Sequence, residues 1–187
     1  MATISDVLFR WNIPPASEEE LNTAKAIVTQ STGWEKDQQT PGVGNVILAD
    51  ITHGLWQRLQ IPVLPQIEVE LAERIRRRRP FPSAFTADQT TDGRSTMEWN
   101  THTVAALQRA WLQKNNIPLC VILIASPIHM GRAKWVYEKM GFKVRPAPVP
   151  NMRYFDGRQD QWWLQWTAGV YLYEFLTRIL FLYKGWI

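Results

Sequence analysis

Apolar and polar positions along the chain follow two patterns that alternate. Short runs rich in apolar residues have the length and composition of buried strands; they cover residues 24–30, 61–64, 119–125 and 142–145, with a weaker candidate at 83–88. Longer segments repeat apolar residues every three or four positions, as amphipathic helices do; they cover residues 45–59, 67–78, 98–114 and 129–140. This alternation predicts an α/β fold, a three-layer sandwich around a mainly parallel, Rossmann-like sheet.

Local signals place some of the helix ends and one loop. Ser17 is followed by three glutamates, which predicts a helix that starts with Ser17 as its N-cap and has an acidic first turn. Gly141 follows the helix expected at residues 129–140, where a glycine can adopt the left-handed backbone that ends a helix. The loop at residues 31–44 is rich in Gly, Gln and Thr, so we expect it to be exposed and mobile.

The C-terminal segment, residues 169–187, is the one candidate for a membrane span. It is apolar, but it carries Glu174, Arg178 and Lys184. A spanning helix needs about 20 mostly apolar residues, and charges in the middle of a bilayer are costly. We therefore expect a helix that docks on the core of the protein, and no membrane span.

Composition narrows the class of protein. The chain has 187 residues, of which 45% are hydrophobic and 20% charged, so we expect one globular domain over residues 1–187. The formal net charge of +4 owes much to residues 76–79, four consecutive arginines at the end of a predicted helix. Arginines there interact favourably with the helix dipole, and a solvated helix end explains them better than a nucleic-acid surface does. No nucleic-acid partner is expected.

Cysteine usage and the N-terminus bear on the compartment. Cys120 is the single cysteine, so an intramolecular disulfide is excluded. Residues 1–15 lack the basic and apolar regions of a signal peptide. Both features predict a cytoplasmic protein. The three histidines have no spacing typical of a metal site, and no metal is expected.

The most informative segment joins the strand at 119–125 to the helix that follows it. In open parallel sheets, ligands bind outside the carboxyl ends of the strands. The N-terminus of a helix at that position favours anions. Ser126, His129 and Arg132 gather there, and His129 and Arg132 share a helix face because they are three residues apart. The alternative is that Ser126 only caps the helix and Arg132 forms an ion pair.

Residues 126–133, Ser-Pro-Ile-His-Met-Gly-Arg-Ala, resemble the Ser/Thr-x-x-His-Met-x-Arg-Ala signature of the YdcF/SanA/ElyC-like family, a domain of unknown function. Residues 174–175 and 182–187 are similar to that family's closing helix, and residues 95–100 to its Ser-x-x-Thr-x-Glu-Asn segment. The resemblance spans about residues 24–187. It implies a Rossmann-like fold, binding of S-adenosylmethionine as a cofactor or ligand, and a link to the cell envelope.

The chain departs from this family in two turns. Where family members carry glycine-rich turns after the first and second strands, this chain has Gln-Ser-Thr-Gly at residues 30–33 and Pro-Gln-Ile-Glu at residues 65–68. Glycine-rich turns let the backbone approach a phosphate closely. The resemblance is therefore to a divergent member.

Polar side chains follow several of the expected strands or precede the helices. The candidates for ligand binding are Gln30, Asn45, Gln66, Thr96, Asn100, Ser126 and Arg132, and the candidates for catalysis are His129, Glu68 and Glu98. Some of them have a structural alternative, since Asn45 and Thr96 could be N-caps and Glu98 part of a capping box. Together they predict one polar pocket where the strands end.

Three classes of function remain open. We favour narrowly an enzyme, a transferase or a hydrolase, that acts on a small anionic or amide-bearing metabolite. In this hypothesis His129 is the acid or base, Arg132 binds the anion, and Glu68 or Glu98 is a second carboxylate. The alternatives are non-catalytic binding of S-adenosylmethionine or a nucleotide-like ligand, and a cell-envelope-associated factor.

Overall fold

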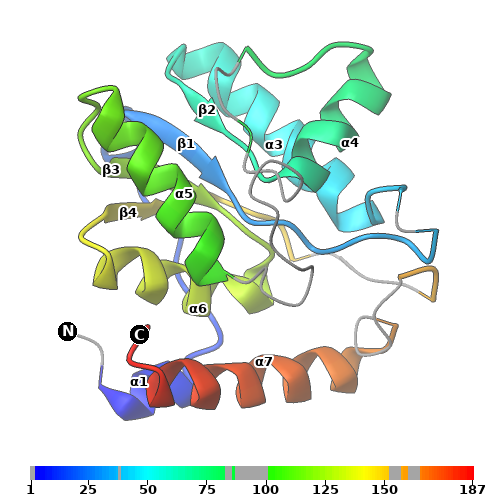
Figure 1. Ribbon diagram of the computed structural model, residues 1–187, viewed down its shortest axis with the longest axis vertical. Helices are drawn as coiled ribbons and strands as arrows, with labels where there is room; N and C mark the ends of the chain where they lie inside the picture. The colour runs from blue at the N-terminus through cyan, green and yellow to red at the C-terminus, as the bar shows by residue number, and fades with distance from the viewer. Residues whose placement is uncertain (1–2, 38, 83–85, 87–100, 152–156, 160–164) are drawn as a thin grey trace.

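A four-stranded, all-parallel sheet lies at the centre of the computed structural model, which describes residues 3–37, 39–82, 86, 101–151, 157–159 and 165–187 (Figure 1). The strands are β1 (Ala26–Thr29), β2 (Val63–Leu64), β3 (Cys120–Ile124) and β4 (Lys143–Pro146). Their order in the sheet is β2-β1-β3-β4. The predicted parallel α/β fold is confirmed, and each of these strands falls at a predicted apolar run.

Helices connect and cover the strands. They are α1 (Ile4–Phe9), α2 (Glu18–Asn22), α3 (Val43–Leu59), α4 (Ile67–Arg77), α5 (Thr101–Lys114), α6 (Pro127–Lys139) and α7 (Thr167–Tyr183). Ser17 caps α2 as predicted, and Gly141 follows α6 with a φ of 87°. Helix α1 was not predicted, because a six-residue helix is too short to show a periodic pattern.

Strands β1, β2 and β3 are buried on both faces, whereas the edge strand β4 exposes Lys143. Side chains of the buried strands alternate between two hydrophobic clusters. On one face, Ile27, Val63 and Ile122 pack against the apolar sides of α3 and α4. On the other face, Val28 and Leu123 pack against α5 and α6. Figure 1 shows these two pairs of helices on opposite sides of the sheet. This is the expected three-layer arrangement.

The chain reverses direction across the sheet between β1 and β3. From β1 it passes through α3 to β2 on one side, and from β3 it passes through α6 to β4 on the other. The carboxyl ends of β1 and β3 therefore form the topological switch point, the place where open α/β sheets bind ligands.

The last helix, α7, packs against α6 and α1 beyond the helical layer (Figure 1). Phe181 joins the hydrophobic cluster beneath α6, so the predicted docking of a C-terminal helix is confirmed. Within the described ranges, none of the helices combines the length and apolar character that crossing a bilayer requires.

Two expectations have other outcomes. The loop after β1 is not uniformly exposed: residues 31–35 are half-buried, because Trp34 and Glu35 form isolated bridges to Pro41 and Gln159. The weak strand expected at residues 83–88 lies almost wholly outside the described residues.

Candidate functional site

Three helices begin at the carboxyl edge of the sheet, each after a strand. Their N-caps are Gly42 for α3, Gln66 for α4 and Ser126 for α6. In the described part of the chain, none of these N-caps uses its side chain to accept a hydrogen bond from the helix. The N-terminal amides of these helices are therefore not satisfied in the usual way.

The helices α1 and α2 make the contrast. Each has a complete capping box, in which the side chain of Thr3 or Ser17 accepts from the third helical amide and the acidic residue there accepts from the cap. Helix α4 has Glu68 and Glu70 in its first turn, where their negative charges interact favourably with the positive end of the helix dipole. The first turns of α3 and α6 contain no acidic residue. The two helices that flank the switch point, α3 and α6, thus have neither a side-chain cap nor an acidic first turn to balance the positive charge of their N-termini.

Gln30 lies at the end of β1, but its side chain belongs to a buried relay of hydrogen bonds. The Gln30 amide donates to the Tyr137 hydroxyl at 2.8 Å, and that hydroxyl donates to the Gln108 side chain. Gln108 in turn donates to the Leu64 carbonyl at 2.7 Å. Burial raises the pKa of Tyr137, so the phenol stays neutral. The relay ties α5 and α6 to the ends of two strands.

Asn45 and Gln66 shape the loop that follows β1. Asn45 Oδ1 accepts from the Thr32 amide at 2.8 Å, and Asn45 Nδ2 donates to the Gly33 carbonyl at 2.7 Å. Gln66 Oε1 accepts from the Ser31 amide at 2.9 Å. Both side chains are buried, and both hold the backbone of the loop in place. Their side chains therefore support the backbone of the loop at the carboxyl edge of the sheet.

The two predicted catalytic carboxylates have different outcomes. Glu68 is buried in the first turn of α4, where its Oε1 accepts from Gln66 Nε2 at 3.4 Å. Glu98 lies outside the described residues, as do the predicted ligand-binding residues Thr96 and Asn100. The single pocket expected from all of these residues stays a prediction.

His129 and Arg132 do lie together on α6, and they meet a carboxylate that the site prediction omitted. Arg132 Nε donates to both oxygens of Glu174 on α7, at 3.2 and 3.0 Å, and Arg132 Nη2 lies 2.9 Å from Glu174 Oε2. Arg132 Nη1 donates to Thr101 Oγ1 at 3.1 Å. Each of the three guanidinium nitrogens thus has a partner within the protein, so the geometry favours a clamp between α6 and α7 over an anion-binding role for Arg132.

The imidazole of His129 is held between the same partners. Arg132 Nη2 lies 2.8 Å from His129 Nδ1, and because a guanidinium can only donate, Nδ1 is the acceptor. His129 Nε2 then carries the ring hydrogen and donates to Thr101 Oγ1 at 3.2 Å. Burial first, and then the charge of Arg132, lower the pKa of His129. The ring is therefore neutral near pH 7.

Glu174 is the centre of the network. Burial alone would raise its pKa, but the charge of the nearby Arg132, the largest lowering influence, together with the contacts to His129 outweighs burial and holds the pKa at about 2. Arg178 Nε donates to Glu174 Oε1 at 3.1 Å, and Arg178 Nη1 donates to the carbonyls of Val7 and Arg10 at the end of α1. We call His129, Arg132, Glu174 and Arg178 the buried charge network. It fastens α7 and α1 to α6.

One sequence signal could have revealed this network. Glu174 and Arg178 are the two charged residues of an otherwise apolar helix, and their spacing of four places them on one face. Charged residues on an otherwise apolar, docked helix need partners inside the protein, and Arg132 is such a partner for Glu174.

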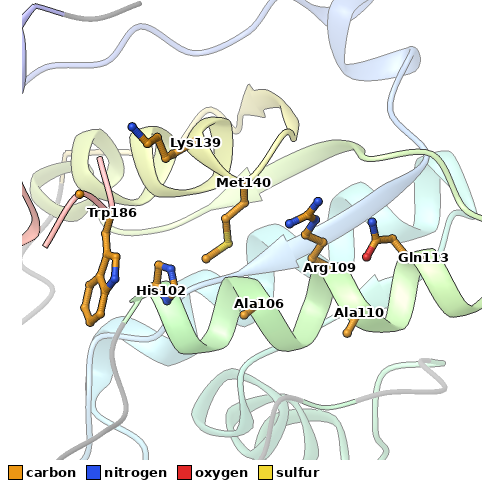
Figure 2. A pocket seen from close by; sticks show the side chains of 9 residues that line it. His102, Ala106, Arg109, Ala110, Gln113, Lys139, Met140 and Trp186 are labelled. Carbon is orange, nitrogen blue, oxygen red and sulfur yellow. The ribbon is translucent and has the colours of Figure 1, made fainter.

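A separate groove lies along α5 (Figure 2). It has a volume of about 400 Å³ and is lined by His102, Ala106, Arg109, Ala110, Gln113, Lys139, Met140, Gly185 and Trp186. In Figure 2 the side chain of Arg109 rises from α5 and that of Met140 descends from the end of α6, so both point into the space between these helices. Within the described residues, the buried Nε atom of Arg109 has no hydrogen-bond partner. The groove is a second place where an anion could bind.

Neither a metal-ligand cluster among the described residues nor a similar known protein points to a particular ligand. In the described ranges, no three His, Cys, Asp or Glu residues gather in a way that could hold a metal ion. Comparisons with protein-family models, with curated proteins and with solved structures found no match to this chain.

Proposed function

We propose that this protein binds a small metabolite with an anionic group at the switch point between β1 and β3. One observation carries the proposal: α3 and α6 flank this point, and in the described residues their N-termini have no side-chain cap and no acidic first turn. Helix N-termini of this kind attract carboxylates and phosphates through their amides and their dipole.

The surrounding side chains support a polar ligand. Asn45 and Gln66 fix the loop after β1, so that its backbone groups are held in place before a ligand arrives. Such preorganisation favours binding because less conformational freedom is lost. The ligand class that fits is an anionic or amide-bearing metabolite.

The catalytic form of the proposal is a transferase or hydrolase that uses His129 as an acid or base. The lowered pKa of His129 supplies the neutral ring that a base requires. However, Nδ1 already accepts from Arg132, and Nε2 faces Thr101. Proton transfer would require this network to open, so binding has more support than catalysis.

Membership in the YdcF/SanA/ElyC-like family remains a proposal as well. It is supported by the contact between Arg132 and Glu174, since these residues come from the two distant segments that carry the resemblance. In this form of the proposal the protein is cytoplasmic and the ligand is S-adenosylmethionine or a nucleotide-like molecule. A link to the cell envelope is the further alternative.

The test is a thermal-unfolding screen of metabolites, because a ligand raises the apparent stability of the protein that binds it. The panel contains phosphorylated sugars, nucleotides, S-adenosylmethionine and carboxylic acids. We expect an anionic compound to raise the midpoint of the wild-type protein. The variant Ser126→Asp places a carboxylate at the N-cap of α6, so it should lose this response through repulsion while its fold is retained.

The control for this screen is Arg109→Gln, which changes the groove along α5 and leaves the switch point intact. It should respond to the ligand as the wild type does. If Arg109→Gln abolishes the response and Ser126→Asp preserves it, the ligand binds in the groove and the proposed location is wrong.

A further inference from the structure

Helix α7 has its charges inside and its apolar residues outside. Of the residues in Thr167–Tyr183, the charged ones are Glu174 and Arg178, and both are buried in the charge network. The opposite side of the helix is exposed and consists mainly of large apolar or aromatic side chains: Tyr171, Leu172, Tyr173, Leu176, Ile179, Leu180 and Tyr183. This is the reverse of a helix that lies on a protein surface in water.

The exposed residues form a continuous stripe with a defined spacing. Leu172, Leu176, Ile179 and Tyr183 are separated by four, three and four residues. This is the spacing of the seam along which two helices pack in a coiled coil, with side chains of one helix inserted between those of the other. Leu176, at the middle of the stripe, is 55% exposed. We call these four residues the α7 seam.

The size of the surface also fits a protein partner. Phe9 of α1 is exposed, and its ring centroid lies 6.2 Å from that of Phe175, so it extends the apolar surface beyond α7. If a side chain of this size presents roughly 200 Å² when fully exposed, the seam and its exposed apolar neighbours offer about 800 Å² per copy. A standard stable interface buries about that area on each partner.

A lipid surface fits less well. A helix that lies on a membrane combines an apolar face with a polar face rich in Lys and Arg, which meets the headgroups. The polar residues of α7 are instead used within the protein, where Arg178 pairs with Glu174. The exposed half of α7 carries no cation within Thr167–Tyr183.

We propose that the α7 seam is the interface of a homodimer, in which α7 packs against α7 of a second copy of this chain. A twofold interface uses the same patch on both partners, so an uncharged stripe can pair with itself without bringing like charges together. Leu176 and Ile179 lie near the middle of the stripe and close to the twofold axis. This proposal does not depend on the proposed metabolite.

The test is the mass of the full chain in solution, measured by sedimentation at micromolar concentration. The wild type should be a dimer, and Leu176→Glu should be a monomer because it places two carboxylates in an apolar interface. The matched control is Ile75→Glu, since Ile75 is 62% exposed on α4, a helix that lies at the opposite end of the molecule from α7 (Figure 1). This control should remain a dimer. Thermal unfolding should show that both variants are folded.

A mixing experiment distinguishes loss of the dimer interface from an indirect effect of the substitution on folding. Copies with Leu176→Glu and copies with Leu176→Lys should each be monomeric, and their mixture should recover dimers because opposite charges then meet near the axis. The dimer is refuted if the wild type is monomeric, whether or not it floats with phosphatidylcholine–phosphatidylglycerol vesicles. It is equally refuted if Leu176→Glu stays dimeric.

Discussion

Two polar regions of this protein lie on α6, and they treat hydrogen-bonding groups in opposite ways. In the buried charge network, Arg132 and Glu174 satisfy each other within the protein. At the switch point, the N-terminus of α6 begins at Ser126 with no side-chain cap among the described residues. The buried charge network contains paired charged side chains. The switch point contains backbone N–H groups at the start of α6 that have no side-chain cap among the described residues.

The difference separates polar groups that are paired within the protein from backbone amides that have no side-chain cap in the described residues. Residues that look catalytic in the sequence, an imidazole beside a guanidinium, are placed where they fasten helices together. The place suited to a ligand is defined by backbone amides and by the absence of caps in the described residues. Our proposal therefore places the ligand at the helix starts beside the switch point and not at the buried charged residues.

Removing the centre of the buried network should have the largest effect. Glu174→Ala leaves Arg132 and Arg178 buried without their shared carboxylate, which costs about 3–5 kcal/mol in typical buried pairs. Denaturant unfolding would measure the loss. Glu138→Ala on the same layer removes the exposed partner of Lys134 and should cost only about 0.3–0.5 kcal/mol. Equal costs for the two variants would show that the network is not structural.

Acid should weaken the same network. The pKa of Glu174 lies near 2 in the folded protein, below its ordinary 4.5, so its contribution to stability is full above pH 4.5 and is lost as the pH falls toward 2. The pKa of His129 is also lowered, so the unfolded ring takes up a proton first as the pH falls below 6.5. Both effects reduce stability in acid.

The measurement is the free energy of unfolding between pH 7 and pH 2. Glu174→Gln should be less stable at pH 7, and its stability should fall less steeply between pH 4.5 and pH 2 than that of the wild type. Parallel curves for the two proteins would assign the acid sensitivity to other groups.

The sequence predicted the parallel sheet well, whereas the pocket expected at the ends of its strands stays a prediction. The run at residues 119–125 is apolar throughout because β3 is buried on both faces, and such runs are readable without a structure. Side-chain partners across the fold are not. The pairing of Arg132 with Glu174 joins residues 42 positions apart, and the docking of α7 decides it.

The same limit applies to the amides at the strand ends. The sequence marks Asn45 as a polar residue near a strand end, but the sequence alone does not show that its side chain bonds to the backbone of Thr32 and Gly33. The sequence leaves two roles open for Ser126, as a cap or as a ligand contact, and the structure shows no side-chain cap hydrogen bond from Ser126 among the described residues. Local sequence predicts the ends of helices, whereas tertiary contacts decide what those ends bind.

A smaller effect distinguishes capped from uncapped helix starts. Ser17→Ala removes the cap of α2 and should cost about 0.5–2 kcal/mol. Ser126→Ala removes no cap from α6 and should change stability by less than about 0.5 kcal/mol without ligand. Thermal unfolding of both variants would check this. A large loss of stability in Ser126→Ala would mean that the serine hydroxyl already accepts a hydrogen bond from the first-turn amides of α6. Fewer of these amides would then be available to bind an anion.

The central claim is that the switch point binds an anion, and amide chemical shifts during titration with inorganic phosphate test it most directly. Chloride at matched ionic strength is the reference, since it removes general salt effects. We expect saturable shifts at the first-turn amides of α3 and α6, including Val43, Gly44, Ile128 and His129, with small changes near Arg109. Shifts that cluster on Arg109 and Lys139, or that fail to saturate at any amide, would contradict it.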